Sequence, residues 1–537
     1  MEAKKLSTRK LLTWLDQNLL AILAGFLLVF IPLYPKLPLF DVIPGYIVRV
    51  RLEDFLIALA VSVWLVQIVR KKARWLHPLA SWIGVYLGFG FLSTLSAIFI
   101  TRTVPYEWLH IGKMYFHYFR YIEYFTLMFI FYSAVRTKLQ GKLLVILLAL
   151  VMIGISLYGY GQKYLYWPVY STMNREFAKG WRLYLTEHAR VPSTFGGHYD
   201  LAAFTMIMLT ILLALFFLTS QKLLKLVFGV SFILAFWLLI LTASRTSFIA
   251  YLVAVTILMG ILLAIKNWKW ALPRWFGVMF FSIAVMLSFG DLSERFTQLL
   301  GLNKIKEKYA SLAFRAKVAE PENSVSVEEV EEITLVTTSS DTPPVPTKPG
   351  GEAQPKELPP DVYEDIPLPV ATESGDWVAV SRTYSENAYK YGLSAAIRFD
   401  ALWPRAIAGF KRNPLLGSGY STLTKEAVGV FTEAESTDNN FLRVLGETGL
   451  AGFITFFGMI VAFMVLIIKK LKLLRREPIF SAFALGMVAA SIGLLFNAFY
   501  IDVFAASKVA EMYWALVGLT LGIMYVSRTK SAPQAKS

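Results

Sequence analysis

The chain has 537 residues, of which 56% are hydrophobic, and its mean hydropathy of +0.54 is that of an integral membrane protein rather than a soluble one. Its formal charge of +16 suits contact with anionic lipid headgroups and requires no nucleic acid as a partner. The sequence contains no cysteine, which excludes disulfides, thiolate metal sites and a cysteine nucleophile.

Hydrophobic runs of about 17–22 residues recur roughly twelve times along the chain, and each is long enough to cross a bilayer. The first follows basic residues, but no small-residue cleavage site comes after it, so we interpret it as a retained span. Alternate loops hold roughly 24 Lys and Arg, against about 13 in the five short loops of the other side. The hydrophobic runs predict an all-α membrane protein, and the charge bias predicts that both termini lie in the cytoplasm. The runs centre near Leu27, Ser62, Leu87, Phe125, Ala149, Met208, Leu234, Val255, Phe281, Met459, Gly486 and Val517.

Two of the predicted outer loops are long. The first, residues 161–198, is rich in aromatic side chains, a composition that fits an interfacial belt or stacking on sugars. The second, residues 291–448, separates spans one to nine (1–290) from spans ten to twelve (449–527), and a cytoplasmic tail follows at 528–537. Its middle, residues 318–376, is rich in Glu, Pro, Ser and Thr and is predicted to be disordered.

The end of the second loop has a different pattern. Residues 395–410 show helical spacing of apolar positions, which predicts an amphipathic helix on the outer face that Pro404 kinks or splits. Asn413-Pro414 then begins a turn, and Gly417 and Gly419 supply left-handed or flexible positions.

Two outer arginines flank neighbouring spans. Arg245 ends the seventh span, and Arg190 comes shortly before the sixth. Either side chain can be a solvated or snorkelling charge. Alternatively, the two guanidinium groups bind a lipid-linked phosphate at one membrane depth.

The segment from Ser436 to Gly452 carries the remaining candidates. Asp438 and Asn439 suit a helix N-cap, and Glu447 stands two residues before Gly449 at the start of a new span. The spans themselves are nearly free of charge. The exceptions are Glu123, Lys508 and Glu511, which we expect towards helix ends.

These motifs together resemble the O-antigen ligase and O-antigen polymerase superfamily. The resemblance lies in Ser244-Arg245, in Arg190 to Phe195, in the run from Arg398 through Trp403 to Asn413-Pro414 and Gly417-Ser418-Gly419, and in the run from Asp438-Asn439 to Gly452. It implies about twelve spans and glycosyl transfer on the outer face of the cytoplasmic membrane, from polyprenyl diphosphate to a sugar hydroxyl, in cell-surface polysaccharide synthesis. It also implies that Arg190, Arg245 and Arg398 bind the diphosphate.

The catalytic base stays open. Ligases of this family usually carry His-Asn where this chain has Asp438-Asn439. Asp is a weak base at neutral pH, so either its pKa is raised, or it orients the acceptor, or Glu447 is the base. Ligase and polymerase differ in the acceptor, which the sequence does not identify.

No cofactor is expected, and no set of His, Asp and Glu has metal-ligand spacing, so we predict a metal-independent reaction. A transporter or lipid flippase is the main alternative, because twelve spans are also typical of transporters. Another class of polyprenyl-phosphate glycosyltransferase would use acidic residues of the first outer loop. The pair Glu53-Asp54 lies there, but we expect it to cap the second span.

Overall fold

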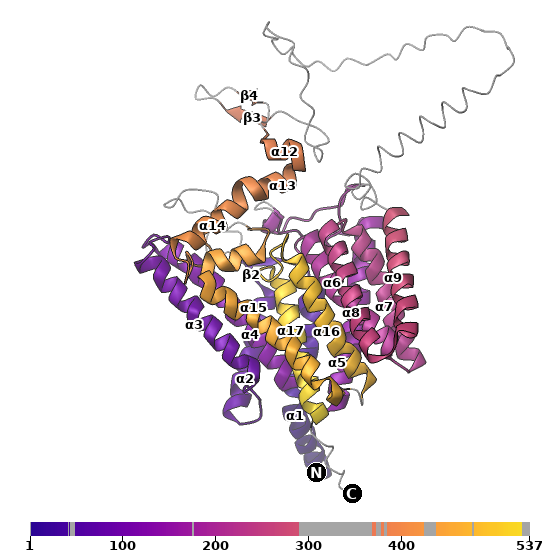
Figure 1. The fold of residues 1–537 in the computed structure, drawn as a ribbon. Helices are drawn as coiled ribbons and strands as arrows, with labels where there is room; N and C mark the ends of the chain where they lie inside the picture. The colour runs from indigo at the N-terminus through magenta and orange to yellow at the C-terminus, as the bar shows by residue number, and fades with distance from the viewer. Residues whose placement is uncertain are drawn as a thin grey trace, which may run out of the picture. The chain divides into compact units, whose positions relative to one another are not determined.

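The computed structural model describes residues 2–40, 42, 49–173, 177–288, 368–371, 377–380, 384–423, 436–474 and 477–528. The chain forms two units, one of residues Met1–Phe296 with Arg398–Ser537 and one of Thr297–Ile397. The first unit is a bundle of long helices (Figure 1).

Twelve helices of 18 residues or more are present in the described part of the first unit. They are α1 (Glu2–Leu33), α2 (Leu52–Val69), α3 (Pro78–Phe99), α4 (Trp108–Ala134), α5 (Lys138–Tyr164), α6 (His198–Leu218), α7 (Lys222–Leu241), α8 (Arg245–Ile265), α9 (Trp268–Ser288), α15 (Asn440–Leu474), α16 (Pro478–Asn497) and α17 (Ser507–Arg528). Eleven of these are long and apolar enough to cross a membrane, and the exception is α4. The chain is therefore a multi-pass, all-α membrane protein.

The core of the bundle lies around α6, α16 and α17. Their most apolar stretches are 83%, 78% and 94% buried, whereas that of α9 is 17% buried, which places α9 at the periphery. Helix α17 packs closely on α4 because Gly518 has no side chain: a Cβ at that position would lie 2.2 Å from the carbonyl oxygen of Met128. This contact fixes α4 against α17, whose apolar stretch is the most buried of the described spans.

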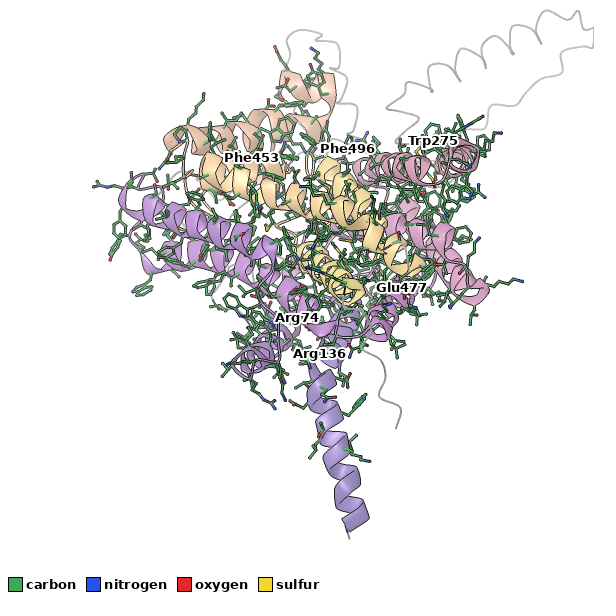
Figure 2. The ribbon with its side chains drawn as sticks, turned by 60° about the horizontal axis from the view of Figure 1, so that its bottom comes forward. Arg74, Arg136, Trp275, Phe453, Glu477 and Phe496 are labelled. Carbon is green, nitrogen blue, oxygen red and sulfur yellow. The ribbon has the colours of Figure 1, made fainter. Side chains whose placement is uncertain are left out.

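Charged residues of three connecting segments lie at one end of the bundle. Figure 2 shows Arg74 and Arg136 near the place where α1 emerges from the bundle. Arg136 donates hydrogen bonds to the carbonyl oxygens of Gln17 and Lys72, at 2.9 Å each. On the same side of α5, Glu477 pairs with Lys138 and Lys142, at 3.1 Å each. These are loops that the charge bias predicts to be cytoplasmic.

Short elements complete the first unit. A hairpin of β1 (Pro38–Phe40) and β2 (Val50–Arg51) precedes α2, and the 3-10 turn η1 (Phe177–Lys179) lies between α5 and α6. Of the predicted amphipathic range 395–410, the first unit contains the π-turn η2 (Arg398–Leu402) and most of α14 (Trp403–Arg412), while the residues before them, at the end of α13 (Leu393–Ile397), belong to the second unit. The π-turn breaks the helix immediately before Pro404.

The second unit contains β3 (Leu368–Ala371) paired antiparallel with β4 (Trp377–Val380), followed by α12 (Glu386–Tyr391) and α13. Most of the predicted disordered insert 318–376 lies outside the described residues. Strand β3 falls within that predicted range, so hydrogen-bonded backbone begins before residue 376.

Candidate functional site

A cavity of about 1090 Å³ lies within the first unit. Its walls come from the β1–β2 hairpin, α2, α4, the start of α6, the start of α15 and the segment between α16 and α17. The charged side chains on these walls are Lys36, Arg49, Arg51, Asp54, Arg120, Glu123, Asp200, Asp438, Arg443, Glu447 and Asp502. Both predicted catalytic carboxylates are among them.

Asp438 and Asn439 have separate roles at the start of α15. The side chain of Asn439 caps the helix, since its Oδ1 accepts from the backbone N–H of Leu442 at 3.0 Å. Asp438 has a left-handed backbone, with φ of 50°, and its carboxylate makes no cap. Instead it pairs with Arg398 at 3.0 Å and accepts from the hydroxyl of Ser436 at 2.8 Å.

The environment of Asp438 makes its carboxylate more basic than usual. Burial raises the pKa of Asp438, while the guanidinium of Arg398 opposes this increase and the charge of Asp502 adds to it. The net direction of the pKa is upwards, which is the direction that the interpretation of Asp438 as the base requires.

Asp502 organises the turn that presents Asp438. Its carboxylate accepts from the backbone N–H groups of Thr437 at 2.7 Å and Asn439 at 3.0 Å, and from Arg443 Nη1 at 3.0 Å. The hydroxyl of Ser436 lies 2.9 Å from this carboxylate as well, so its single proton is shared between Asp438 and Asp502. Sequence reasoning missed Asp502. The available signal was a single acidic residue in the otherwise uncharged stretch between Asn497 and Ser507.

Glu447 lies at a kink in α15. Gly449 has φ of 64° and ψ of −167°, which breaks the helix and leaves two preceding carbonyl groups for other donors. Of these, the oxygen of Gly446 accepts from Ser418 N–H and that of Glu447 from Gly419 N–H, both at 2.9 Å. The Glu447 carboxylate accepts from the backbone N–H of Ser421 at 3.1 Å.

The predicted turn residues pack directly against this kink. Asn413 folds the turn, because its Oδ1 accepts from the N–H groups of Leu415 at 3.2 Å and Leu416 at 3.1 Å. The carbonyl oxygen of Pro414 then accepts from Leu450 N–H at 2.9 Å. Gly417, with φ of 71°, approaches so closely that a Cβ there would lie 2.5 Å from the carbonyl of Glu447. The two motifs therefore form one unit around Glu447.

Arg443 links the Asp502 turn with Glu447. Its Nη1 pairs with Asp502, and its Nε lies 3.5 Å from Glu447 Oε1. The residue is 8% exposed, so this charge is neutralised by two carboxylates inside the protein.

A second charged group on the cavity wall joins α4 to α2. Arg120 Nη1 lies 2.7 Å from Asp54 Oδ1 and 2.9 Å from Glu123 Oε2. Asp54 also caps α2, as predicted, by accepting from the N–H of Arg51 at 2.8 Å. Glu123 lies in the middle of α4, so the expectation that it is near a helix end is wrong. Lys508 and Glu511 do lie in the first turns of α17.

The three predicted diphosphate-binding arginines are not among the residues that line the cavity. Arg398 reaches it through Asp438. Arg190 Nη1 lies 2.7 Å from His198 Nε2 and 3.0 Å from the hydroxyl of Tyr199, which does line the cavity. Arg245 begins α8. A hydrogen bond from Val191 N–H to the carbonyl oxygen of Leu241, at 3.2 Å, joins the segment of Arg190 to the end of α7.

Within the described ranges, no group of three or more His, Asp or Glu side chains is placed to hold a metal ion. Metal independence stays a prediction. No protein-family model matches this chain, and no curated protein sequence matches it either.

Proposed function

We propose that the chain is a membrane glycosyltransferase of the O-antigen ligase or polymerase type, acting at the outer face of the cytoplasmic membrane in cell-surface polysaccharide synthesis. The observation that carries this proposal is the presence of two candidate bases, Asp438 and Glu447, in one cavity that is also lined by the cationic side chains of Lys36 and Arg51. A carboxylate for the acceptor proton and fixed positive charge for the leaving group are what the reaction requires.

The β1–β2 hairpin offers a binding place for the donor diphosphate. The hairpin pairs Pro38 with Arg51 and so brings Lys36 near Arg51. Burial lowers the pKa of Lys36, and the charge of Arg51 lowers it further. Both cations already have partners inside the protein: Arg51 Nη1 lies 3.5 Å from Glu53 Oε1, and Lys36 Nζ donates to Ser507 Oγ at 2.8 Å. A diphosphate at this place would exchange these contacts for charge-assisted hydrogen bonds to both cations.

In the proposed reaction, a hydroxyl oxygen of the acceptor sugar attacks the anomeric carbon of the donor. The new glycosidic bond forms while the bond from that carbon to the diphosphate oxygen breaks. The polyprenyl diphosphate leaves with the electron pair, and the hydroxyl proton passes to Asp438 or Glu447. Because the backbone around both carboxylates is fixed by hydrogen bonds, the bases are held in place before substrate arrives.

A reconstituted transfer assay tests this function. The protein is placed in nanodiscs with a polyprenyl-diphosphate oligosaccharide and a free oligosaccharide acceptor, and both the joined glycan and the released polyprenyl diphosphate are measured. We expect equal amounts of the two products. Glu447→Gln should lower the rate, whereas the matched control Glu477→Gln, which affects a lysine-paired carboxylate outside the cavity, should not. Absence of transfer by the wild type with all of a panel of such donors would contradict the proposal.

A transporter remains the alternative, and one observation favours it. Lys508 and Glu511 are fully buried near the start of α17, and, within the described residues, neither carboxylate oxygen of Glu511 has a hydrogen-bond partner. The same vesicles separate the two functions. Movement of a labelled polyprenyl-diphosphate glycan across the bilayer without any transfer product would favour transport.

A further inference from the structure

Helices α2 and α4 lie side by side in Figure 1, and we call the line of contact between them the seam. The side chains that line the cavity along this seam change from charged to apolar. On α2, the lining residues are Asp54, Ile57, Ala58, Val61 and Ser62, whose spacing puts them on one helix face. Only the first is charged. The lining therefore becomes apolar as α2 runs away from the β1–β2 hairpin.

Helix α4 supplies the facing wall. Arg120 pairs with Asp54 across the seam, and Phe119 and Ile122 beside it also line the cavity. Further along the helix, Glu123, which pairs with Arg120, and then Thr126 continue this wall. The wall thus has the charged group of Asp54, Arg120 and Glu123 at one end, and on α2 mainly apolar side chains beyond it.

The cavity opens to the surface of the bundle through this seam. Phe116 and Phe119 are 42% and 53% exposed, and Ala58 and Ser62 are exposed as well, although all four line the cavity. In a membrane-spanning bundle, such side chains face hydrocarbon. From Asp54 to Ser62 the helix rises about 12 Å, which gives the opening the length of a groove rather than of a small hole.

We propose that this α2–α4 groove binds the isoprenoid tail of the lipid donor, with its diphosphate at Lys36 and Arg51. The identity of the tail rests on the proposed function. The shape of the ligand rests on continuity: one cavity is lined by the buried cations Lys36 and Arg51 near the hairpin and by exposed apolar side chains along α2 and α4. An amphiphile with an anionic head and a single apolar chain satisfies both ends at once, whereas a free sugar phosphate leaves the groove empty.

Photocrosslinking at two exposed positions of α2 tests the groove. Benzoylphenylalanine replaces either Ser62, which lines the cavity, or Leu59, which is 53% exposed but does not line it. Each full-length variant is placed in phosphatidylcholine nanodiscs with radiolabelled geranylgeranyl diphosphate and irradiated. We expect labelling at 62 to exceed that at 59 by at least about tenfold, and unlabelled geranylgeranyl diphosphate, but not geranylgeraniol, to compete. Equal labelling at both positions, or equal labelling at 62 by a labelled phosphatidylglycerol, would overturn the proposal.

Bulky substitution provides an independent measurement. Ser62→Trp should raise KM at least about fivefold for a donor with a long isoprenoid tail and change it little for a donor with a ten-carbon tail, while Leu59→Trp should leave both unchanged. A Ser62→Trp protein with wild-type KM for both donors would contradict the groove. The crosslink requires no acceptor and no chemistry, so labelling at 62 without any glycan transfer would reject the proposed function and leave the groove standing.

Discussion

The guanidinium of Arg443 lies 3.0 Å from the carboxylate of Asp502, although the two residues are far apart in the sequence. The same carboxylate holds the turn that contains Asp438, and the same guanidinium approaches Glu447 at 3.5 Å. The two candidate bases are thus connected through one buried ion pair. Replacing Arg443 should therefore change the surroundings of both candidate bases, whereas replacing one base should change mainly its own surroundings.

The identity of the base is tested by two isosteric substitutions. If Asp438 is the base, Asp438→Asn removes proton acceptance and should lower the transfer rate by a factor on the order of 10²–10⁴, with donor binding retained. Asp438→His should then restore part of the activity, with a pH dependence moved towards the imidazole pKa. Rates are measured in nanodiscs across pH. An Asp438→Asn profile with the height and shape of the wild type would assign the base to Glu447.

The turn that packs against the kink of α15 should be sensitive to a single methyl group. Gly417 has φ of 71°, and a Cβ there would lie 2.5 Å from backbone atoms of Glu447. We expect Gly417→Ala to reduce the free energy of unfolding by about 2–3 kcal/mol, from the left-handed backbone and the overlap together. Gly88→Ala, in α3 and with nothing within 4 Å of the added Cβ, is the control and should be neutral or slightly stabilising. Thermal unfolding in detergent measures both. Equal transitions would show that the backbone around Glu447 can shift freely.

The sequence predicted the helical membrane fold because runs of apolar residues long enough to span a bilayer are a local signal. It also placed Asn413 to Gly419 and Glu447 to Gly449 among the candidates, and the structure brings them together. It did not predict Asp502 or Arg120. Their partners lie on other helices, and no local pattern relates Asp502 to Thr437 or Arg120 to Asp54. Arg443 offered a local signal, since it precedes Glu447 by four residues on one helix face.

The two candidate phosphate-binding arginines, Arg51 and Arg245, differ in whether they line the cavity. Arg51 lines the cavity beside Lys36, whereas Arg245 begins α8 and is not among the lining residues. We expect Arg51→Gln to weaken donor binding about tenfold or more, because a buried charge-assisted contact is lost. Arg245→Gln should weaken it less than about threefold. Binding of geranylgeranyl diphosphate in nanodiscs is measured by filter retention. A larger loss of donor affinity in Arg245→Gln than in Arg51→Gln would instead place the diphosphate near Arg245 and Arg190.

Donor binding at this place should also depend on pH. The pKa of Lys36 is lowered in the empty protein, and an anion stabilises the protonated ammonium. Affinity for the diphosphate should therefore fall as pH rises through this lowered pKa. In Lys36→Met the dependence should disappear, and affinity at neutral pH should be lower than in the wild type. An unchanged alkaline dependence in Lys36→Met, measured by the same filter assay, would show that another group causes it.

The final prediction uses two charges that act on Asp438 in opposite directions. Arg398 lowers its pKa and Asp502 raises it. The other charged groups that share the cavity with Asp438 are Lys36, Arg49, Arg51, Asp54, Arg120, Glu123, Asp200, Arg443 and Glu447. A base must be deprotonated, so activity rises as pH increases through the pKa of Asp438. The acidic limb of the pH–rate profile is the part in which the rate rises with pH. Arg398→Gln should therefore move this limb to higher pH, by about one unit, and Asp502→Asn should move it to lower pH.

The opposite signs distinguish an electrostatic effect from damage to the fold. Loss of the turn held by Asp502 lowers the maximal rate but does not move the limb towards acid. Rate profiles of the wild type and both variants are measured from about pH 3 to about pH 8, which includes the ordinary pKa values of Asp and His side chains. Shifts in the same direction, or no shift in either variant, would show that Asp438 does not titrate in the rate-limiting step. If the two single variants shift the limb in opposite directions as expected, the double variant Asp502→Asn with Arg398→Gln should have its limb close to the wild-type position, because the two charge effects offset one another.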